Sequence, residues 1–262
     1  MRYLFLLCLS LLTFGCDGEE PTGGEDPTTG ISWVNIPAGS FMMGSEHELD
    51  EQPIHQVTVQ AFQMSETEVT VGQYRQCFEA GRCSEPSTED EVGCTWSASP
   101  SDKEDHPINC LDWGQARTFA VWEGGDLPTE AQWEYAARGG EDFEYAGSDN
   151  VDEVAWYDEN SQYSTQPVKT KRANGYGLYD MSGNVWEWTL DEPHHNYQGA
   201  PSEAETPWGN VPPCSQVCDN VLSWRVSRGG SWYDYAGNLR VAYRSDYNPG
   251  GRSYYLGFRV RR

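Results

Sequence analysis

The sequence predicts a fold of short strands and a few helices joined by many loops, and its composition carries that prediction. Aromatic residues make up 13% of the 262 residues, and 11 residues are tryptophan. Large rings fill a core without much regular secondary structure. The 27 glycines and 15 prolines favour turns over long regular elements. A chain of this length forms one large domain or two small ones.

The chain is strongly acidic. It has 41 Asp and Glu residues against 17 Lys and Arg residues, which gives a formal charge of −24. Such a field repels a phosphate backbone, so nucleic acid is not expected as a partner. It favours solubility and can attract cations.

The first 30 residues predict an export signal and a tether. Arg2, a short apolar run, Gly15 and Cys16 follow one another in the order of a signal peptide over residues 1–15. Cys16 after Gly15 resembles the lipobox of bacterial lipoproteins, which predicts acylation of Cys16 and anchoring to a membrane of the cell envelope. Plain secretion is the alternative. Residues 16–30 predict an acidic flexible linker, because residues 17–30 contain no aliphatic or aromatic side chain.

The body of the chain is expected to fold from residue 31 to residue 262. Period-2 patterns predict strands within residues 31–60, and further strands are expected over residues 224–232 and 257–260. Helix-capping residues and following glycines bound the helical patterns between these regions. The expected helices are residues 71–80 after Thr70, residues 113–123 after Asp112, and residues 129–139 with Thr129 and Gln132 in a capping box.

One run, residues 177–189 (GLYDMSGNVWEWT), matches neither a helix nor a strand pattern. Its carboxylates, Asp180 and Glu187, flank Gly183, where a turn is expected. Such a turn can bring both carboxylates to one point while the tryptophans anchor the loop in a core. The run predicts an ordered loop that can hold a hard cation. The alternative is that the carboxylates only accept hydrogen bonds from nearby backbone N–H groups.

Six cysteines remain beyond the signal peptide and Cys16. An even number in an exported chain favours disulfides, although the sequence alone does not determine their connectivity. Local pairing is expected, because each of these pairs brackets one short loop: Cys77–Cys83, Cys94–Cys110 and Cys214–Cys218. A zinc site is the alternative for the last pair. It would use Cys214 and Cys218 with His194 and His195.

Eight segments together resemble one family. They are residues 36–45 (IPAGSFMMGS), 50–55 (DEQPIH), 68–70 (EVT), 106–113 (HPINCLDW), 127–139 (LPTEAQWEYAARG), 183–188 (GNVWEW), 228–232 (RGGSW) and 257–259 (GFR). Their order and content resemble the sulfatase-modifying factor family, whose best-known member is the formylglycine-generating enzyme. The resemblance covers residues 31–262. It implies a single α+β domain of the formylglycine-generating-enzyme-like type, related to C-type lectins, with low regular secondary structure.

The resemblance also implies a structural calcium site in the run 177–189. The positions of this sequence that match the family's ligands are Asp180, Gly183, Val185 and Glu187. Gly183 and Val185 would offer backbone carbonyl oxygens. Calcium prefers several oxygen ligands, and two carboxylates balance its charge. Calcium is therefore the expected cofactor.

Catalysis is where the sequence departs from the family. The enzyme oxidises a cysteine of a client sulfatase to formylglycine with O₂ and copper(I), which is held by two cysteines shortly after the Gly-Gly-Ser turn. Ser231 matches the family's reactive cluster, but no cysteine follows Cys218. Copper(I) prefers soft thiolates, so Asp234 or Tyr235 would be a poor substitute. Copper is not expected, and whether the chain is an enzyme stays open.

The remaining basic side chains admit two interpretations. Arginines near the C-terminus either line an anion- or peptide-binding groove or form salt bridges with the many carboxylates, and salt bridges are preferred. The histidines outside the zinc alternative are expected to form hydrogen bonds within loops. The arginines are Arg240, Arg244, Arg252 and Arg259, and the histidines are His47, His55 and His106.

Taken together, the residues and the resemblance predict an exported lipoprotein whose domain lacks the copper-binding cysteine pair. We expect a non-copper binding or accessory module for a peptide, a glycan or another envelope protein. One rival is an oxidase of the same family that acts on a cysteine-containing or small-molecule substrate through residues not identified. The other is a purely structural, calcium-stabilised domain.

Overall fold

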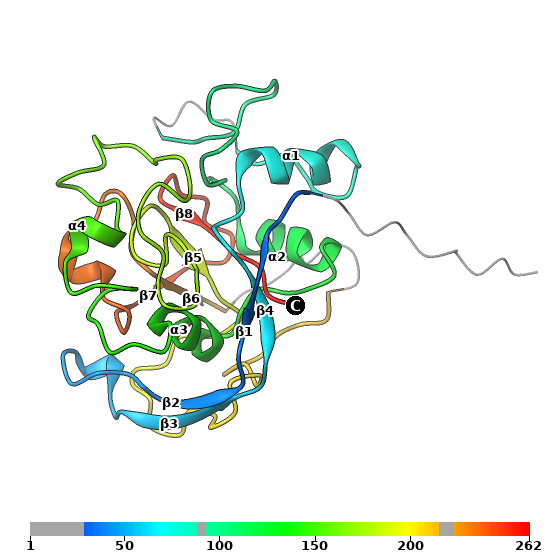
Figure 1. The fold of residues 1–262 in the computed structure, drawn as a ribbon. Coiled ribbons are helices and arrows are strands. Elements are labelled where there is room, and N and C mark those ends of the chain that lie inside the picture. Colours follow the sequence, from blue (N-terminus) through cyan, green and yellow to red (C-terminus); the bar gives the residue numbers. More distant parts are fainter. Residues whose placement is uncertain (1–28, 88–92, 215–222) are drawn as a thin grey trace, which may run out of the picture.

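A long bent ribbon, a central sheet and three main helices organise the computed structural model, which describes residues 29–87, 93–214 and 223–262 (Figure 1). The predicted signal peptide, Cys16 and Cys218 lie outside the described residues. Within the described ranges, no helix is both long enough and apolar enough to cross a membrane.

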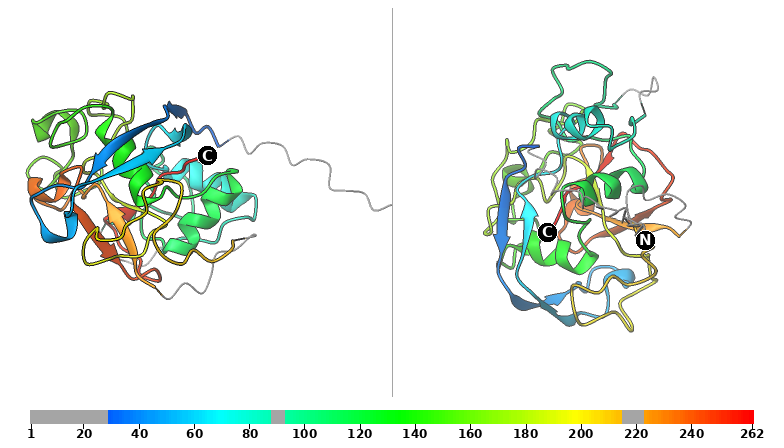
Figure 2. Two further views of the ribbon diagram at one scale, coloured as in Figure 1. Left: turned by 90° about the horizontal axis from the view of Figure 1, so that it is seen from below. Right: turned by 90° about the vertical axis from the view of Figure 1, so that its right-hand side faces the viewer.

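The N-terminal strands form the bent ribbon. β1 (Trp33–Ile36) pairs antiparallel with β4 (Phe62–Ser65), and β2 (Gly39–Met43) pairs antiparallel with β3 (His55–Val59). β1 leads directly into β2, and β3 leads directly into β4, so the two strand pairs form one ribbon. The hydrogen-bond ladder is interrupted beside Pro37, which has no N–H to donate. Figure 2 shows this ribbon, in blue and cyan, along one edge of the molecule. The sequence patterns predicted β1, β2 and β3, but not β4.

The three predicted helices are confirmed. Each begins at a capping box. The side chain of the capping residue accepts a hydrogen bond from the backbone amide of the third helical residue, a glutamine. The side chain of that glutamine in turn accepts a hydrogen bond from the backbone amide of the capping residue. The third helix ends at Gly139, whose φ of +62° lies in the left-handed region that favours glycine. The helices are α1 (Val71–Glu79) after Thr70, α2 (Trp113–Trp122) after Asp112 and α3 (Glu130–Arg138) after Thr129.

The central sheet has four strands in the order β7-β6-β5-β8. The inner strand β5 pairs antiparallel with β6 on one side and parallel with β8 on the other, so it joins β8 to the antiparallel part of the sheet. The strands are β5 (Trp186–Trp188), β6 (Arg225–Arg228), β7 (Arg244–Tyr247) and β8 (Leu256–Gly257). Three short elements complete the described fold: α4 (Val151–Val154) and the 3₁₀ helices η1 (Leu49–Glu51) and η2 (Ala236–Leu239).

Two strand predictions need correction in the central sheet. The run 177–189 was expected to be a loop throughout, but its residues 186–188 form β5 and are all buried. A strand this short, buried on both faces, shows no alternation from which sequence analysis could detect it. The strand expected over residues 257–260 ends at Gly257. Beyond it, the carbonyls of Phe258 and Val260 accept from Val69 N (2.9 Å) and Ser65 N (2.8 Å).

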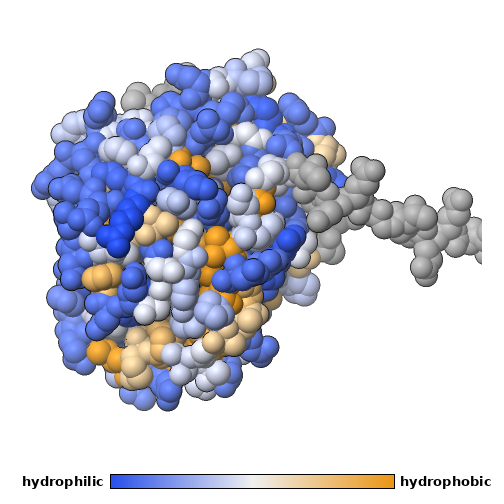
Figure 3. Space-filling view, in the orientation of Figure 1, coloured by the Kyte–Doolittle hydropathy of each residue, from blue (hydrophilic) through white to orange (hydrophobic). Residues whose placement is uncertain are grey.

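The interior is aromatic, as the composition predicts. Trp113, Trp133 and Trp188 are among the largest fully buried side chains. Trp113 and Trp188 pack in one apolar cluster beside α1 and α2, and Trp133 packs in another beneath the ribbon. The outer face in Figure 3 is mostly hydrophilic, with hydrophobic residues in scattered groups.

Disulfides close two loops of the described chain. Cys77 bonds to Cys83 and Cys94 bonds to Cys110, as predicted. Cys214 is also disulfide-bonded. Its predicted partner, Cys218, lies outside the described residues.

Candidate functional site

The run 177–189 folds as a tight turn that enters β5. Asp180, Gly183 and Asn184 all have positive φ, at 56°, 84° and 61°. A Cβ on Gly183 would lie 2.3 Å from the carbonyl oxygen of Trp156, so glycine is required at that position. The amide of Gly183 donates to the carbonyl of Gly229 (2.8 Å). This bond joins the run to the glycine turn that leads to Ser231.

Three buried carboxylates meet inside this turn. Asp180 is 3% exposed, and Glu187 and Glu68 are fully buried. Glu68 comes from the segment between β4 and α1, and it accepts from the amide of Val185 (3.0 Å) and the side-chain amide of Asn184 (2.7 Å). The sequence analysis brought Asp180 and Glu187 together correctly but missed Glu68 as a member of the site. Its place in the family motif at residues 68–70 was the available indication.

A single arginine is the cation of this cluster. Arg259, also fully buried, forms two hydrogen bonds with the carboxylate of Glu187, at 2.6 and 2.7 Å. Trp133 Nε1 donates to the same carboxylate at 2.7 Å. Arg259 also donates to the carbonyl oxygens of Ser65 (3.2 Å) and Tyr179 (2.9 Å). The guanidinium is therefore held by one carboxylate and two carbonyls, the oxygen types that also bind hard cations.

These contacts bear on whether the predicted calcium ligands fit an ion. Asp180 and Glu187 lie in one buried cluster, but among the described residues no group of three or more acidic, histidine or cysteine side chains is arranged to hold a metal ion. Both oxygens of Glu187 are also engaged by Arg259, and one oxygen of Asp180 accepts from the amide of Lys169 (2.7 Å). In this arrangement the guanidinium takes the place on Glu187 that a calcium ion would need. The residues fit calcium only if Arg259 moves away.

The cluster carries an excess of negative charge, and the pKa values reflect it. Burial, then Asp180 and Glu187, hold the pKa of Glu68 well above its usual value. Burial raises the pKa of Asp180 to about 6, against the amide of Lys169 and the charge of Arg259. One guanidinium does not neutralise three carboxylates in a low-dielectric site.

The turn after Gly229 and Gly230 is the position where the family resemblance places chemistry. Ser231 is fully buried there. One oxygen of Asp234 accepts from the amide of Ser231 (3.0 Å), from the hydroxyl of Ser231 and from Trp186 Nε1 (2.8 Å). Burial raises the pKa of Asp234, and these hydrogen bonds oppose the rise. The turn thus holds a hydrogen-bonded carboxylate and hydroxyl, both hard oxygen groups.

Exposed aromatic rings surround this turn. Tyr233 is 55% exposed, and Tyr235 and Tyr163 are each 73% exposed. The segment that carries Tyr163 is fixed against the turn, because Ser161 Oγ donates to the carbonyl of Trp232 (2.8 Å). We call the group Tyr163, Tyr233 and Tyr235 the aromatic face.

The C-terminal arginines form salt bridges, which confirms the preferred interpretation. Arg240 pairs with Glu51 at 2.7 Å, and Arg244 pairs with Glu130 at 2.6 Å. The fourth arginine, Arg252, pairs at 2.9 Å with the helix-capping Asp112, at a more exposed position. Glu130 also pairs with the buried Arg228 at 2.7 Å. Burial alone would raise the pKa of Glu130, but Arg244 and Arg228 lower it to about 2.

The zinc alternative at Cys214 does not hold. A disulfide-bonded sulfur is not a thiolate ligand, and Cys214 is disulfide-bonded. His194 instead stacks on Trp208, with ring centroids 3.6 Å apart, and its Nδ1 contacts the carbonyl of Glu192 at 2.9 Å. Across the described ranges, no group of three or more His, Cys, Asp or Glu side chains is arranged to hold a metal ion.

Of the other histidines, His47 and His106 lie in loops, whereas His55 is the first residue of β3, not a loop residue as expected. His55 Nδ1 lies 3.1 Å from the carbonyl oxygen of Pro53. His106 Nδ1 lies 3.0 Å from the hydroxyl of Thr165, and burial lowers the pKa of His106 to about 4. The amide of His47 donates to the hydroxyl of Ser45 at 3.0 Å.

The fold has close relatives among solved structures. A structure of PvdO from Pseudomonas aeruginosa matches with a TM-score of 0.75 and 28% identity, over 92% of this chain and 97% of that one. Treponema denticola variable protein 1 matches with a TM-score of 0.70 and 27% identity, over 88% of this chain and 94% of that one. These matches, together with the turns and sheet described above, define a formylglycine-generating-enzyme-like domain of the C-type-lectin-related kind.

Sequence comparison identifies the family. A family model described as "Sulfatase-modifying factor enzyme 1-like domain" matches residues 20–262. The formylglycine-generating enzyme of Streptomyces coelicolor is 30% identical over 298 aligned positions, which cover 92% of each chain. The chain belongs to the sulfatase-modifying factor family.

Proposed function

We propose that this protein is a binding or accessory member of the family that does not use copper. The observation that carries the proposal is the turn at Ser231. No cysteine follows Cys218 in the chain, and in the turn itself Asp234 binds Ser231 and Trp186 through hydrogen bonds. Copper(I) prefers thiolates, whereas this site offers carboxylate and hydroxyl oxygens.

Oxygen uptake with copper(I) and a cysteine-containing peptide tests the proposal against its rival, an oxidase of the same family. The formylglycine-generating enzyme of Streptomyces coelicolor is the positive control for peptide and copper loading. We expect turnover from that enzyme and none from this protein. Formylglycine or another oxidised peptide product above the copper-only background would refute the proposal.

The aromatic face is the proposed binding surface for a peptide or glycan. Exposed rings stack on sugar faces and anchor peptides, because a large apolar surface is combined with little side-chain entropy. Tyr233, Tyr235 and Tyr163 present such rings to solvent. The buried Trp232 packs against one of them, with its ring 5.4 Å from that of Tyr233.

Glycan and peptide arrays can identify the ligand, and two variants can locate its site. We expect Tyr235→Ala to weaken binding of any array ligand by about tenfold or more, as for an anchor residue. Met42→Ala, which changes a 53% exposed side chain on β2, is the matched control and should bind as the wild type does. A ligand that binds both variants equally well would move the site away from the aromatic face. The absence of any saturable ligand would favour a purely structural role.

Calcium at Asp180, Gly183, Val185 and Glu187 stays a proposal that rests on the family resemblance. The excess of buried carboxylates around Arg259 supports it, since a divalent cation would balance their charge. The pairing of Glu187 with Arg259 counts against it. Elemental analysis of the purified protein, with melting measured before and after chelation, decides between the two.

Export and lipid anchoring at Cys16 likewise stay proposals from the first 30 residues of the sequence. Metabolic labelling with a fatty acid should mark the wild type but not Cys16→Ser, and only the wild type should fractionate with membranes. Equal labelling of both proteins would refute acylation at Cys16. An unlabelled wild type recovered outside the cell would favour plain secretion.

A further inference from the structure

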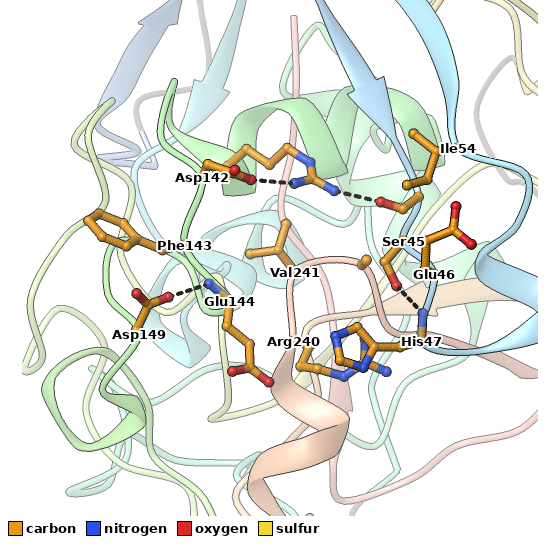
Figure 4. Close-up of a pocket in the computed structure, with 13 residues that line it drawn as sticks. Ser45, Glu46, His47, Ile54, Asp142, Phe143, Glu144, Asp149, Arg240 and Val241 are labelled. Carbon is orange, nitrogen blue, oxygen red and sulfur yellow. Dashed lines mark hydrogen bonds and ion pairs between the residues drawn. The ribbon is translucent and has the colours of Figure 1, made fainter.

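A pocket of about 450 Å³ is lined by no residue of the turn at Ser231 and none of the aromatic face (Figure 4). Its volume falls in the range of small-ligand sites. One wall comes from residues 44–54, the loop between β2 and β3, and the other from residues 138–149, the last residue of α3 and the segment that follows it. Arg240, Val241 and Ala242 lie between the two walls.

The pocket contains two arginines, which at first suggests an anion site. Both guanidiniums already pair with buried carboxylates, although Arg138 shares Glu134 with the buried Arg228. Arg138 donates to the buried Glu134 at 2.6 and 3.1 Å, and Arg240 donates to Glu51 at 2.7 and 3.0 Å. Glu134 and Glu51 are fully buried. An incoming anion would have to compete with carboxylates that are desolvated and hydrogen-bonded in place, so the arginines supply little free positive charge.

The rim supplies the opposite charge. Glu46, Asp142, Glu144 and Asp149 all line the pocket and are exposed. Asp142 lies 4.0 Å from Arg138 with its side chain in solvent, and Asp149 accepts from the amide of Glu144 at 2.9 Å. Figure 4 shows the carboxylates of Asp142, Glu144 and Asp149 on one side and that of Glu46 on the other. The four rim carboxylates outnumber the positive charge that Arg138 retains while it shares Glu134 with Arg228, so the pocket is negative.

The distribution of these groups selects an organic cation over a metal ion. In the part of the chain that the structure describes, no three acidic, histidine or cysteine side chains are close enough to share a metal. The carboxylates instead surround an opening whose floor is apolar, with Val241 2% and Ala242 6% exposed. Ile54 and Phe143 add apolar surface to the walls. Such a site suits a positive group on an aliphatic stem, because the stem packs on the floor while the charge stays near the rim.

We propose that this pocket binds an organic cation, namely a primary ammonium or guanidinium group on an aliphatic chain. A lysine or arginine side chain of a peptide and a free polyamine are the two sources of that chemistry. None of the lining residues belongs to the aromatic face, so this site and the proposed function can fail separately.

Titration of the purified full chain with three matched probes tests the charge requirement. The probes are the Nα-acetyl amides of lysine, arginine and norleucine, where norleucine has an aliphatic stem without the charge. We expect saturable binding of the two cationic probes and weaker or no binding of norleucine. Equal binding of norleucine, or no saturable binding of either cationic probe up to the millimolar range, would overturn the proposal. Spermidine and a tri-lysine peptide then distinguish the free polyamine from the peptide source.

Two variants locate the site. The double variant Asp142→Asn, Glu144→Gln removes two rim charges. It retains the backbone amide at position 144, which still donates its hydrogen bond to Asp149. We expect the double variant to bind the lysine probe about three- to tenfold more weakly, since exposed ion pairs contribute little each. Glu79→Gln, an exposed carboxylate on α1 outside the pocket, is the control and should bind as the wild type does. Unchanged binding by the double variant, or equal loss in the control, would refute the assignment. Unaltered melting of each variant shows that it is folded.

Discussion

Removing the charge of Asp180 should stabilise the protein at neutral pH. The change is Asp180→Asn, which suits the backbone because asparagine tolerates the positive φ of 56° at this position. The new side-chain carbonyl can still accept from the amide of Lys169, as Asp180 does at 2.7 Å. The variant therefore removes a buried charge while keeping the turn and its hydrogen bond.

The magnitude follows from the pKa of Asp180, which burial raises from 3.8 to about 6. This difference in pKa between the unfolded and folded states corresponds to about 3 kcal/mol. The sign follows from proton binding. Between pH 4 and 6 the folded state holds a proton that the unfolded state releases, so this group lowers the free energy of unfolding as pH rises through that window. The variant should equal the wild type near pH 4 and exceed it by up to about 3 kcal/mol at pH 7.

Urea unfolding in chelator at pH 4, 5, 6, 7 and 8, with disulfides intact, measures this difference. The charge of Asp180 helps to hold the pKa of Glu68 high, so the measured difference reports the coupled pair rather than Asp180 alone. Asp142→Asn, a fully exposed position, is the control and should stay within about 0.5 kcal/mol of the wild type at every pH. A variant no more stable than the wild type at pH 7, or a difference that does not change with pH, would refute the reasoning. Calcium that stabilises only the wild type would instead support the proposed calcium site.

Three further predictions follow from the same contacts. Arg259→Met should lower the free energy of unfolding by about 4 kcal/mol, because it leaves Glu187 buried without its cation. Adding Glu187→Gln to the same chain should recover part of this loss. Urea unfolding measures both effects. Replacing Cys94 and Cys110 by serine should lower the free energy of unfolding by about 3 kcal/mol, as expected for a disulfide between residues 16 positions apart. Thermal melting measures the loss. A loss near zero would show that the disulfide is not formed. If calcium binds, chelation should lower the melting temperature, and full retention with no calcium found by elemental analysis would remove the calcium proposal.

The elements that sequence analysis predicted correctly are those with local chemical signatures. The capping boxes at Thr70, Asp112 and Thr129 involve residues only three positions apart, so the sequence displays them directly. The first two disulfides span 6 and 16 residues and are local for the same reason. In contrast, β5 has three residues, and its neighbours β6 and β8 come from 37 or more positions further along the chain. Only tertiary pairing defines such a strand.

The candidate site divides in the same way. Asp180 and Glu187 lie within one run, and a turn at Gly183 sufficed to bring them together. Glu68 and Arg259 joined them from opposite ends of the domain, 119 positions before and 72 after Glu187. The sequence could name Arg259 only as one of several arginines with two possible roles. Its burial against Glu187 decided that it acts as an internal cation.

The sequence by itself indicated the family, the loop-rich α+β architecture, the positions of the three main helices and the lack of cysteine after Cys218, and it favoured local disulfides without determining their connectivity. These depend on short patterns or on residue identity, which the chain carries regardless of its folding. Only the tertiary structure decided which charges pair. It placed Arg259 on Glu187, Arg240 on Glu51 and Arg244 on Glu130. The physical reason is that the energy of a charge depends on its burial and its neighbours, and residues far apart in sequence supply both.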